Sequence, residues 1–168
     1  MKIKNSFFLL ITFFISLMSC SKEEIDNTPS IIGDWVLTSY NIGILVDLDK
    51  DGNESLNLLD EMVCENNEIL TFTSEGIVSS NNTFHPTISV LQSDLNGDYM
   101  VDVECAEGAI GFTSTYSFET NSVNFNNNTS RISEDTLETI YENAVEIYNL
   151  EGTEIVEIKN LTLTYSKR

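Results

Sequence analysis

The chain has 168 residues, of which 41% are hydrophobic, so it is long enough for one domain with a substantial core. It carries 27 acidic and 8 basic residues, which give a formal net charge of −19. Nucleic-acid binding and electrostatic docking on anionic lipid both need clustered Lys and Arg. Arg131 is the only basic residue between Lys50 and Lys159. The composition argues against both classes and favours a cation, a basic partner, or an acidic surface that keeps the protein soluble.

The first twenty residues have the layout of a secretory signal. Lys2 and Lys4 precede an uncharged run from position 7 to 17, which is shorter than the ~20 apolar residues that span a bilayer. The run ends in Leu17-Met18-Ser19-Cys20, which resembles a bacterial lipobox, although Met18 is an unusual occupant. The resemblance implies that residues 1–19 are a lipoprotein signal peptide and that Cys20 carries a diacylglycerol and a fatty acid such as palmitate. The alternative is an ordinary cleaved signal that contains a cysteine.

Residues 20–31 are polar and contain Pro29, which predicts a lipidated tether ahead of a folded domain at 32–168. Residues 21–168 have no second long apolar run, so we expect lipid to be the membrane attachment. The segment Ser21-Lys22-Glu23-Glu24 resembles the surface-display signal of Bacteroidota lipoproteins, and its alternative is a plain solvated tether. We expect an outer-membrane lipoprotein, with exposure on the cell surface as the finer prediction.

Two cysteines remain after lipidation of Cys20, namely Cys64 and Cys105. An even pair in an oxidising compartment predicts a disulfide. It would close a loop of about forty residues and stabilise the fold by roughly 3–4 kcal/mol. The alternative is two buried thiols that pack as small hydrophobic groups.

Short β-rich segments separated by polar turns fill the rest of the chain. Ser55 is a candidate N-cap for one short helix at 55–62. Asn96-Gly97 lies between two β-rich runs and predicts a hairpin, in which Val101, Val103 and Cys105 point inward. The predicted strands are 32–40, 68–73, 77–79, 87–92, 99–104, 112–118, 123–125, 154–158 and 161–165.

Residues 136–148 fit two structures. The apolar positions from Leu137 to Tyr148 have helical spacing, and a pair of strands broken at Glu142-Asn143 fits as well. We favour strands because the neighbouring segments are β. The whole pattern predicts an all-β fold, either an antiparallel barrel or a sandwich.

Several motifs together resemble the small lipocalin-like lipoproteins of Bacteroidota, a largely uncharacterised family. They are the lipobox, Gly33-x-Trp35 in the first strand, an acidic Asp-Gly loop, Asn57-Leu58-Leu59-Asp60-Glu61 with Cys64, and the terminal segment 161–167. The resemblance implies a lipocalin-like up-and-down β-barrel of about eight to ten strands, in which the tryptophan plugs the closed end. It implies a fold and a location but no activity.

The acidic loop at 47–55 is the most specific candidate site. Carboxylates at the first, third and fifth positions and Gly52 at the sixth match the first half of an EF-hand calcium loop. Leu58 stands where that loop has a bidentate glutamate, and Asp60 or Glu61 is the candidate replacement. The predicted Ca²⁺ ligands are Asp47, Asp49, Asp51, Asn53 and Ser55. The alternative is an acidic surface turn without metal.

Features of a catalytic site are scarce, and we expect no enzyme. His85 is the single histidine, and no Gly-x-Ser-x-Gly turn occurs. We expect a binding module for a small apolar ligand or an envelope protein, and not for nucleic acid. The alternative is an accessory subunit of an envelope complex with a calcium-braced loop. The candidate cavity residues, which could equally be packing residues, are Trp35, Phe72, Phe112, Tyr116 and Phe118.

Overall fold

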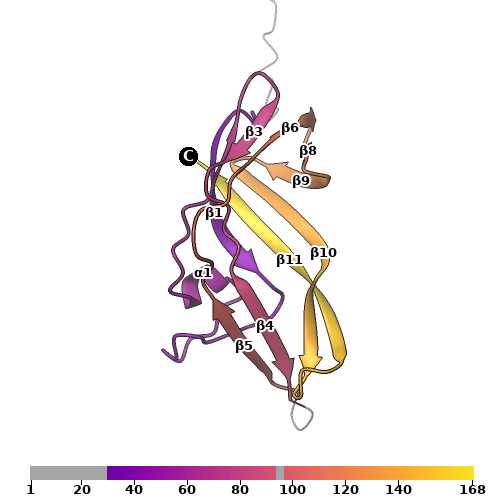
Figure 1. Ribbon diagram of the computed structural model, residues 1–168. Coiled ribbons are helices and arrows are strands. Elements are labelled where there is room, and N and C mark those ends of the chain that lie inside the picture. Colours follow the sequence, from indigo (N-terminus) through magenta and orange to yellow (C-terminus); the bar gives the residue numbers. More distant parts are fainter. Residues whose placement is uncertain (1–29, 94–96) are drawn as a thin grey trace, which may run out of the picture.

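The computed structural model describes residues 30–93 and 97–168, so the predicted signal peptide, the Cys20 lipidation site and most of the tether lie outside it. The fold is all-β, with one helix of four residues (Figure 1). Its elements are β1 Gly33–Asn41, α1 Leu58–Glu61, β2 Ile69–Phe72, β3 Ile77–Ser80, β4 Thr87–Gln92, β5 Tyr99–Glu104, β6 Phe112–Thr115, β7 Ser117–Glu119, β8 Ser122–Phe125, β9 Asn128–Ser133, β10 Thr136–Asn149 and β11 Ile155–Lys167.

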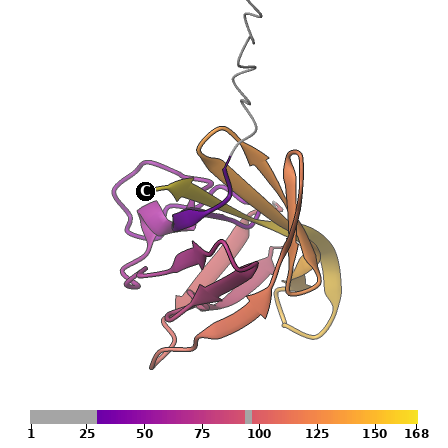
Figure 2. The same ribbon diagram turned by 90° about the horizontal axis from the view of Figure 1, so that it is seen from above.

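Nine of these strands form a nearly closed antiparallel barrel, which confirms the predicted fold class. Their order is β6-β3-β2-β1-β11-β10-β9-β8-β7. The two ends of this path, β6 and β7, are separated in the chain by Tyr116 alone. This short connection keeps the two ends of the strand order close together, so the sheet curves into a barrel. Figure 2 shows this curvature from above.

The hairpin of β4 and β5 has the predicted bounds, and it is inserted between β3 and β6. Its Asn-Gly turn lies partly in residues 94–96, outside the described residues. β4 also runs parallel to the end of β10, through Val90 to Gln92 paired with Ile147 to Asn149. Figure 1 shows β4 and β5 beside the lower part of the long β10–β11 ribbon. This parallel contact is the one departure from the predicted antiparallel pattern among the described strands.

The ambiguous segment at 136–148 is one strand of fourteen residues, and β11 is also continuous where two strands were predicted. The predicted break at Glu142-Asn143 is a bulge, because the pairing with β11 shifts between Tyr141 and Val145. Asn143 there has a φ of 56°. A bulge adds residues to one strand without ending it, so the ribbon bends and continues.

The helix is shorter than predicted and has a different cap. It begins after Asn57, whose side chain accepts the Leu59 N–H, whereas the predicted cap was Ser55. Among the described residues, no helix has the length and hydropathy required to cross a membrane.

The core extends through the whole barrel from Trp35, which is fully buried at the end of the sheet where β1 pairs with the end of β11. Its indole N–H donates a 2.8 Å hydrogen bond to the carbonyl of Ile31, and Lys167 Nζ lies 5.4 Å from the ring centroid. Ile31 was assigned to the tether, but it is 4% exposed and packs in the core.

Candidate functional site

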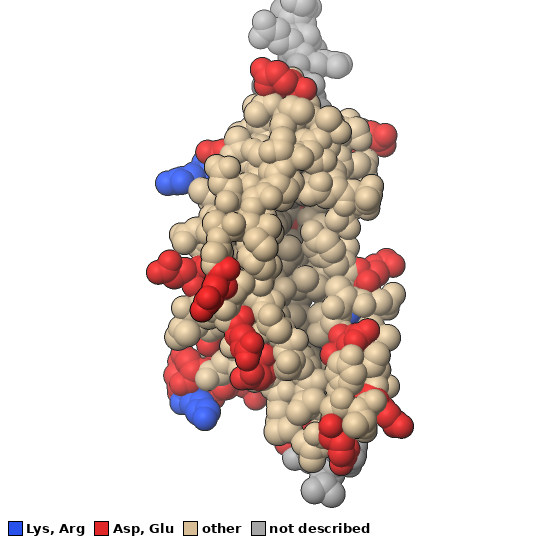
Figure 3. Space-filling view, viewed as in Figure 1, with Lys and Arg blue, Asp and Glu red and all other residues tan. Residues whose placement is uncertain are grey.

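A half-open cavity of about 320 Å³ lies inside the barrel. Its walls come from strands on both sides of the ring and from the connection between β3 and β4. The lining residues are Tyr40, Glu68, Leu70, Thr83, Phe84, His85, Pro86, Phe112, Phe125, Asn126, Asn128, Tyr141, Leu161, Leu163 and Tyr165. The face seen in Figure 3 is hollowed near its centre, and tan atoms surround the hollow.

One side of the barrel wall has a gap. β10 pairs with β9 as far as Thr139 and with β4 from Ile147 onward. Between these positions, this edge of β10 has no strand neighbour among the described residues. Tyr141 lies in that interval and lines the cavity, and Asn126 and Asn128, beside the β8–β9 turn, line the cavity as well. The cavity therefore borders this gap in the strand pairing.

Glu68, directly before β2, is the acidic residue of the cavity, and it is 2% exposed. Its Oε2 accepts a 2.9 Å hydrogen bond from the Phe84 N–H, and its Oε1 accepts one of 3.1 Å from the Tyr165 hydroxyl. These two bonds fix the carboxylate inside the barrel and hold the β3–β4 connection over it. The residue is placed by alternation, because positions 68, 70 and 72 are the buried face of this strand.

Burial raises the pKa of the Glu68 carboxyl, and the hydrogen bonds from Phe84 and Tyr165 oppose this rise. The same buried environment and the Glu68 charge also change the pKa of three tyrosine hydroxyls. Burial, followed by the Glu68 charge, raises the pKa of Tyr40 to about 12 and also raises the pKa of Tyr141 and Tyr165. The three hydroxyls therefore stay protonated at neutral pH and serve as hydrogen-bond donors.

Tyr40 reaches the cavity because of a bulge in β1. The pairing with β11 shifts between Leu37 and Ser39, so the inward positions change from odd to even numbers. The Asn57 side chain satisfies the backbone at this bulge: Oδ1 accepts the Tyr40 N–H at 2.9 Å, and Nδ2 donates to the Thr38 carbonyl at 3.2 Å. The same side chain caps α1, so Asn57 fixes the helix against the strand.

Of the five candidate cavity residues, Phe112 lines the cavity. Trp35 and Phe72 are buried in the packed core, at 0% and 1% exposure. Tyr116 and Phe118 are half-buried and pack against that core. Phe112 and Phe72 meet through Phe125, which stacks on Phe112 at 6.4 Å and meets Phe72 edge-on at 5.5 Å.

The predicted disulfide joins Cys64 to Cys105, across 41 residues. It ties the segment after α1 to the end of the β4–β5 hairpin. Cys105 is exposed, whereas the strand alternation predicted an inward position, because β5 ends at Glu104. Both cysteines line a surface pocket of about 410 Å³, and residues 83–86 separate this pocket from the cavity. The disulfide therefore braces the outer side of the cavity wall.

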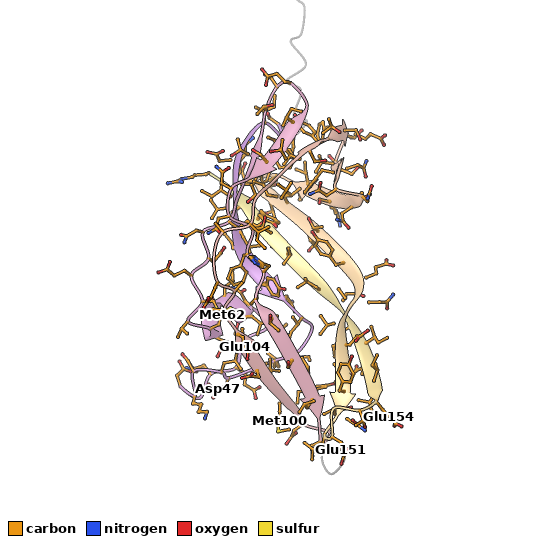
Figure 4. The ribbon with its side chains drawn as sticks, viewed as in Figure 1. Asp47, Met62, Met100, Glu104, Glu151 and Glu154 are labelled. Atoms are coloured by element: carbon orange, nitrogen blue, oxygen red, sulfur yellow. A yellow bond between two sulfur atoms is a disulfide. The ribbon has the colours of Figure 1, made fainter. Side chains whose placement is uncertain are left out.

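The acidic loop is closed by two backbone hydrogen bonds between Val46 and Ser55, of 3.0 and 2.8 Å. Within it, ligand atoms of Asp47, Asp49 and Glu61 all lie within 4.8 Å of one another. Asp47 Oδ2 accepts the Gly52 N–H, and its Oδ1 is buried with no hydrogen-bond partner among the described residues. Figure 4 shows Asp47 on the loop below α1, the helix that carries Glu61.

Three of the predicted calcium ligands stand apart from this group. The Asp51 carboxylate accepts bonds from the Asn53 N–H and side-chain amide, at 2.7 to 3.1 Å. Ser55 Oγ donates to Asp60 and accepts the Asn57 N–H. The structure therefore brings together Asp47 and Asp49, and the buried Glu61 completes the cluster in place of a ligand from position 58.

Comparison of the chain with protein-family models found no match, and comparison with curated proteins and with solved structures found no significant match.

Proposed function

We propose that the protein is a lipid-anchored binding module of the bacterial cell envelope, which takes a small, largely apolar molecule into its barrel. The observation that carries this proposal is the cavity beside Glu68, with its lateral gap in the wall. A volume of about 320 Å³ lies at the small end of the range for ligand pockets. The lining is aromatic and aliphatic with a few polar groups, as such pockets usually are.

The anchor and the location rest on the sequence. The lipobox-like ending at Cys20 supports lipidation, and the resemblance to Bacteroidota lipoproteins supports the outer membrane and display at the cell surface. Two or three acyl chains would hold the protein stably at the membrane. The folded body would then meet ligands that reach the envelope from outside the cytoplasm.

The proposal is tested on the mature chain, residues 20–168, purified without lipid as a Cys20→Ser variant. All described residues and the complete barrel lie in this chain. Fluorescence titration with the uncharged probe N-phenyl-1-naphthylamine should show saturable binding. Leu161→Trp places a larger side chain on the half-buried cavity wall and should abolish the signal.

The matched control is Ile140→Trp, at an exposed position on the same ribbon that does not line the cavity. It should leave probe binding unchanged. Equal binding to both variants, or no saturable binding to the unmodified barrel, would contradict a ligand-binding interior.

We also propose a calcium-braced loop, the second candidate function, in which the module is an accessory subunit of an envelope complex. The observation that favours it is the buried, unpaired Asp47 Oδ1 facing a cluster of carboxylates. Alternating carboxylates suit a hard cation such as Ca²⁺. Three clustered carboxylates would repel one another without a cation, so the ion would hold the loop against α1.

Calorimetric titration with CaCl₂ should give binding at roughly 10⁻⁴–10⁻³ M, the range of extracellular calcium modules. A chelator should lower the melting temperature. Asp47→Asn should remove both effects, and the isosteric change at an exposed site, Asp135→Asn, should remove neither. No heat of binding together with no change in melting temperature would retire the calcium proposal.

A further inference from the structure

The cavity holds an acidic group whose one basic neighbour in the lining is His85, which lowers the pKa of the Glu68 carboxyl less than burial raises it. Glu68 is buried, and no Lys or Arg lines the cavity among the described residues. The salt bridge that the described residues form joins Lys159 to Glu157, on the β11 ribbon. Buried carboxylates are normally paired with a cation or neutralised by a proton. The Glu68 carboxylate has two hydrogen-bond donors but no ion pair with Lys or Arg among the described residues, so a cationic ligand could supply that charge.

Aromatic rings lie on the same cavity wall as this carboxylate. Tyr40, Tyr141 and Tyr165 line the cavity, and the pKa of each responds to the Glu68 charge. The Tyr40 ring packs edge-on against Phe84, with 5.6 Å between ring centroids. The faces of such rings attract organic cations, most strongly where water is excluded.

We propose that the ligand is an organic cation, an ammonium group attached to an apolar body, whose charge lies at Glu68 among the tyrosine rings. This inference rests on the proposed binding function and names its ligand class. The apolar body would contact Leu70, Leu163, Phe112 and Phe125, which line the same cavity. Thr83 Oγ1, buried and without a hydrogen-bond partner among the described residues, is a further polar atom of a residue that lines this cavity.

The net negative charge of the whole chain also favours a cationic ligand. The net charge is −19, so the field at the molecular surface attracts cations and repels anions. Arg131, in the middle of β9, is exposed between the buried Ser130 and Ile132, and so lies on the outer face of the barrel. His85 is the basic side chain in the lining, and its imidazole Nδ1 lies 2.6 Å from the Thr83 carbonyl oxygen.

The test compares three probes of similar size on the mature Cys20→Ser chain at pH 7.5. They are benzyltrimethylammonium, its uncharged isostere neopentylbenzene, and the anion phenylacetate. Competition against N-phenyl-1-naphthylamine gives the three affinities. The cation should bind at least about tenfold more tightly than the isostere, since interactions with a buried charge are worth that much. The anion should not compete.

The second arm changes the carboxylate. Glu68→Gln keeps an oxygen that can accept the bond from Phe84 but removes the charge, so it should weaken cation binding about tenfold or more and leave the isostere unchanged. The control Glu151→Gln makes the same charge change at an exposed position at the far end of the β10–β11 ribbon (Figure 4). It should leave all three affinities unchanged.

A third variant keeps the test valid if Glu68→Gln fails to fold. Tyr141→Leu removes one ring at a half-buried position and should weaken the cation about fivefold more than the isostere. Equal affinity for cation and isostere in the unmodified barrel would overturn the cation inference while leaving the binding function intact. Absence of competition by all three probes, with no binding of the naphthylamine, would overturn both.

Discussion

The Tyr165 hydroxyl donates a 3.1 Å hydrogen bond to Oε1 of Glu68, across 97 positions of the chain and inside the barrel. Tyr165 belongs to β11 and Glu68 lies directly before β2; these two strands are not neighbours in the sheet, because β1 lies between them. The bond therefore spans the inner face of three strands. It also supplies one of the two donors that hold the buried Glu68 carboxylate in place.

Tyr165→Phe should lower the free energy of unfolding by about 1–3 kcal/mol, because it leaves one buried oxygen of Glu68 without a donor. Urea denaturation at pH 7 measures it. The matched control is Tyr148→Phe, which removes a 2.6 Å bond to Glu146 at the surface and should change stability by less than about 0.5 kcal/mol. Equal losses of unfolding free energy in the two variants would show that the buried hydrogen bond stabilises the fold no more than the surface bond does.

The stability contributed by Glu68 should depend on pH with a defined sign. Because burial raises its folded pKa above the unfolded value, the folded state binds the proton more tightly. The contribution is therefore fully present below the unfolded pKa and is lost as pH rises through the folded pKa. Compared with Glu68→Gln, the unmodified chain should lose stability as pH rises above the unfolded glutamate pKa of about 4.3 and through the raised folded pKa. Denaturation curves at several pH values check this, and a gain over that range would contradict it.

The affinity for a cation should increase with pH, whereas the stability contributed by Glu68 decreases. Ionised Glu68 is the form that attracts an ammonium group, so affinity for benzyltrimethylammonium should rise as pH rises through the Glu68 pKa. His85 and the three tyrosines face the same cavity. The dependence should vanish in Glu68→Gln and persist in His85→Gln. The reverse result would assign it to the imidazole.

Asn57→Ala should disturb the strand and the cavity together. The change removes the acceptor for the Tyr40 and Leu59 N–H groups and the donor to the Thr38 carbonyl, so a loss of about 2–3 kcal/mol is expected. Thermal and urea unfolding measure the loss, and probe affinity should fall as well. Asn121→Ala, at an exposed turn, is the control. Normal probe affinity in a folded Asn57→Ala chain would show that the bulge does not position Tyr40.

The disulfide should stabilise the barrel mainly through the unfolded chain. For a separation of 41 residues, the chain-entropy estimate is ~4 kcal/mol. The double variant Cys64→Ser, Cys105→Ser should lose about this much, and reductant should destabilise the unmodified chain but not the double variant. Equal stability with and without reductant would contradict the prediction.

Local sequence signals predicted much of this fold. The hairpin of β4 and β5 follows from β-rich runs on either side of Asn96-Gly97, and the cysteine pair follows from its even number. Turn-forming residues and the alternation of apolar and polar residues in strands involve only a few neighbouring positions, so they can be recognised in a single sequence. The parallel contact of β4 with β10 joins residues 57 positions apart, as in Ile147 and Val90, and no local pattern encodes it.

The candidate site was harder to predict because its residues depend on register. Strict alternation from Trp35 and Leu37 predicts that even-numbered residues such as Tyr40 point outward. The bulge after Leu37 reverses this alternation and turns Tyr40 inward. Glu68 has the parity of Leu70 and Phe72, and this was a usable signal, but a carboxylate on a buried face contradicts the usual pattern. In the acidic loop, Glu61 joins the cluster through the placement of α1, which the loop motif alone does not specify.

The central claim is that the barrel interior receives a cationic ligand at Glu68. An NMR titration of ¹⁵N-labelled mature Cys20→Ser chain with benzyltrimethylammonium tests it most directly. The account predicts saturable shifts centred on the amides of Glu68, Phe84 and Tyr141, which are absent in Glu68→Gln. Shifts confined to the acidic outer surface, or shifts that persist in Glu68→Gln, would contradict it.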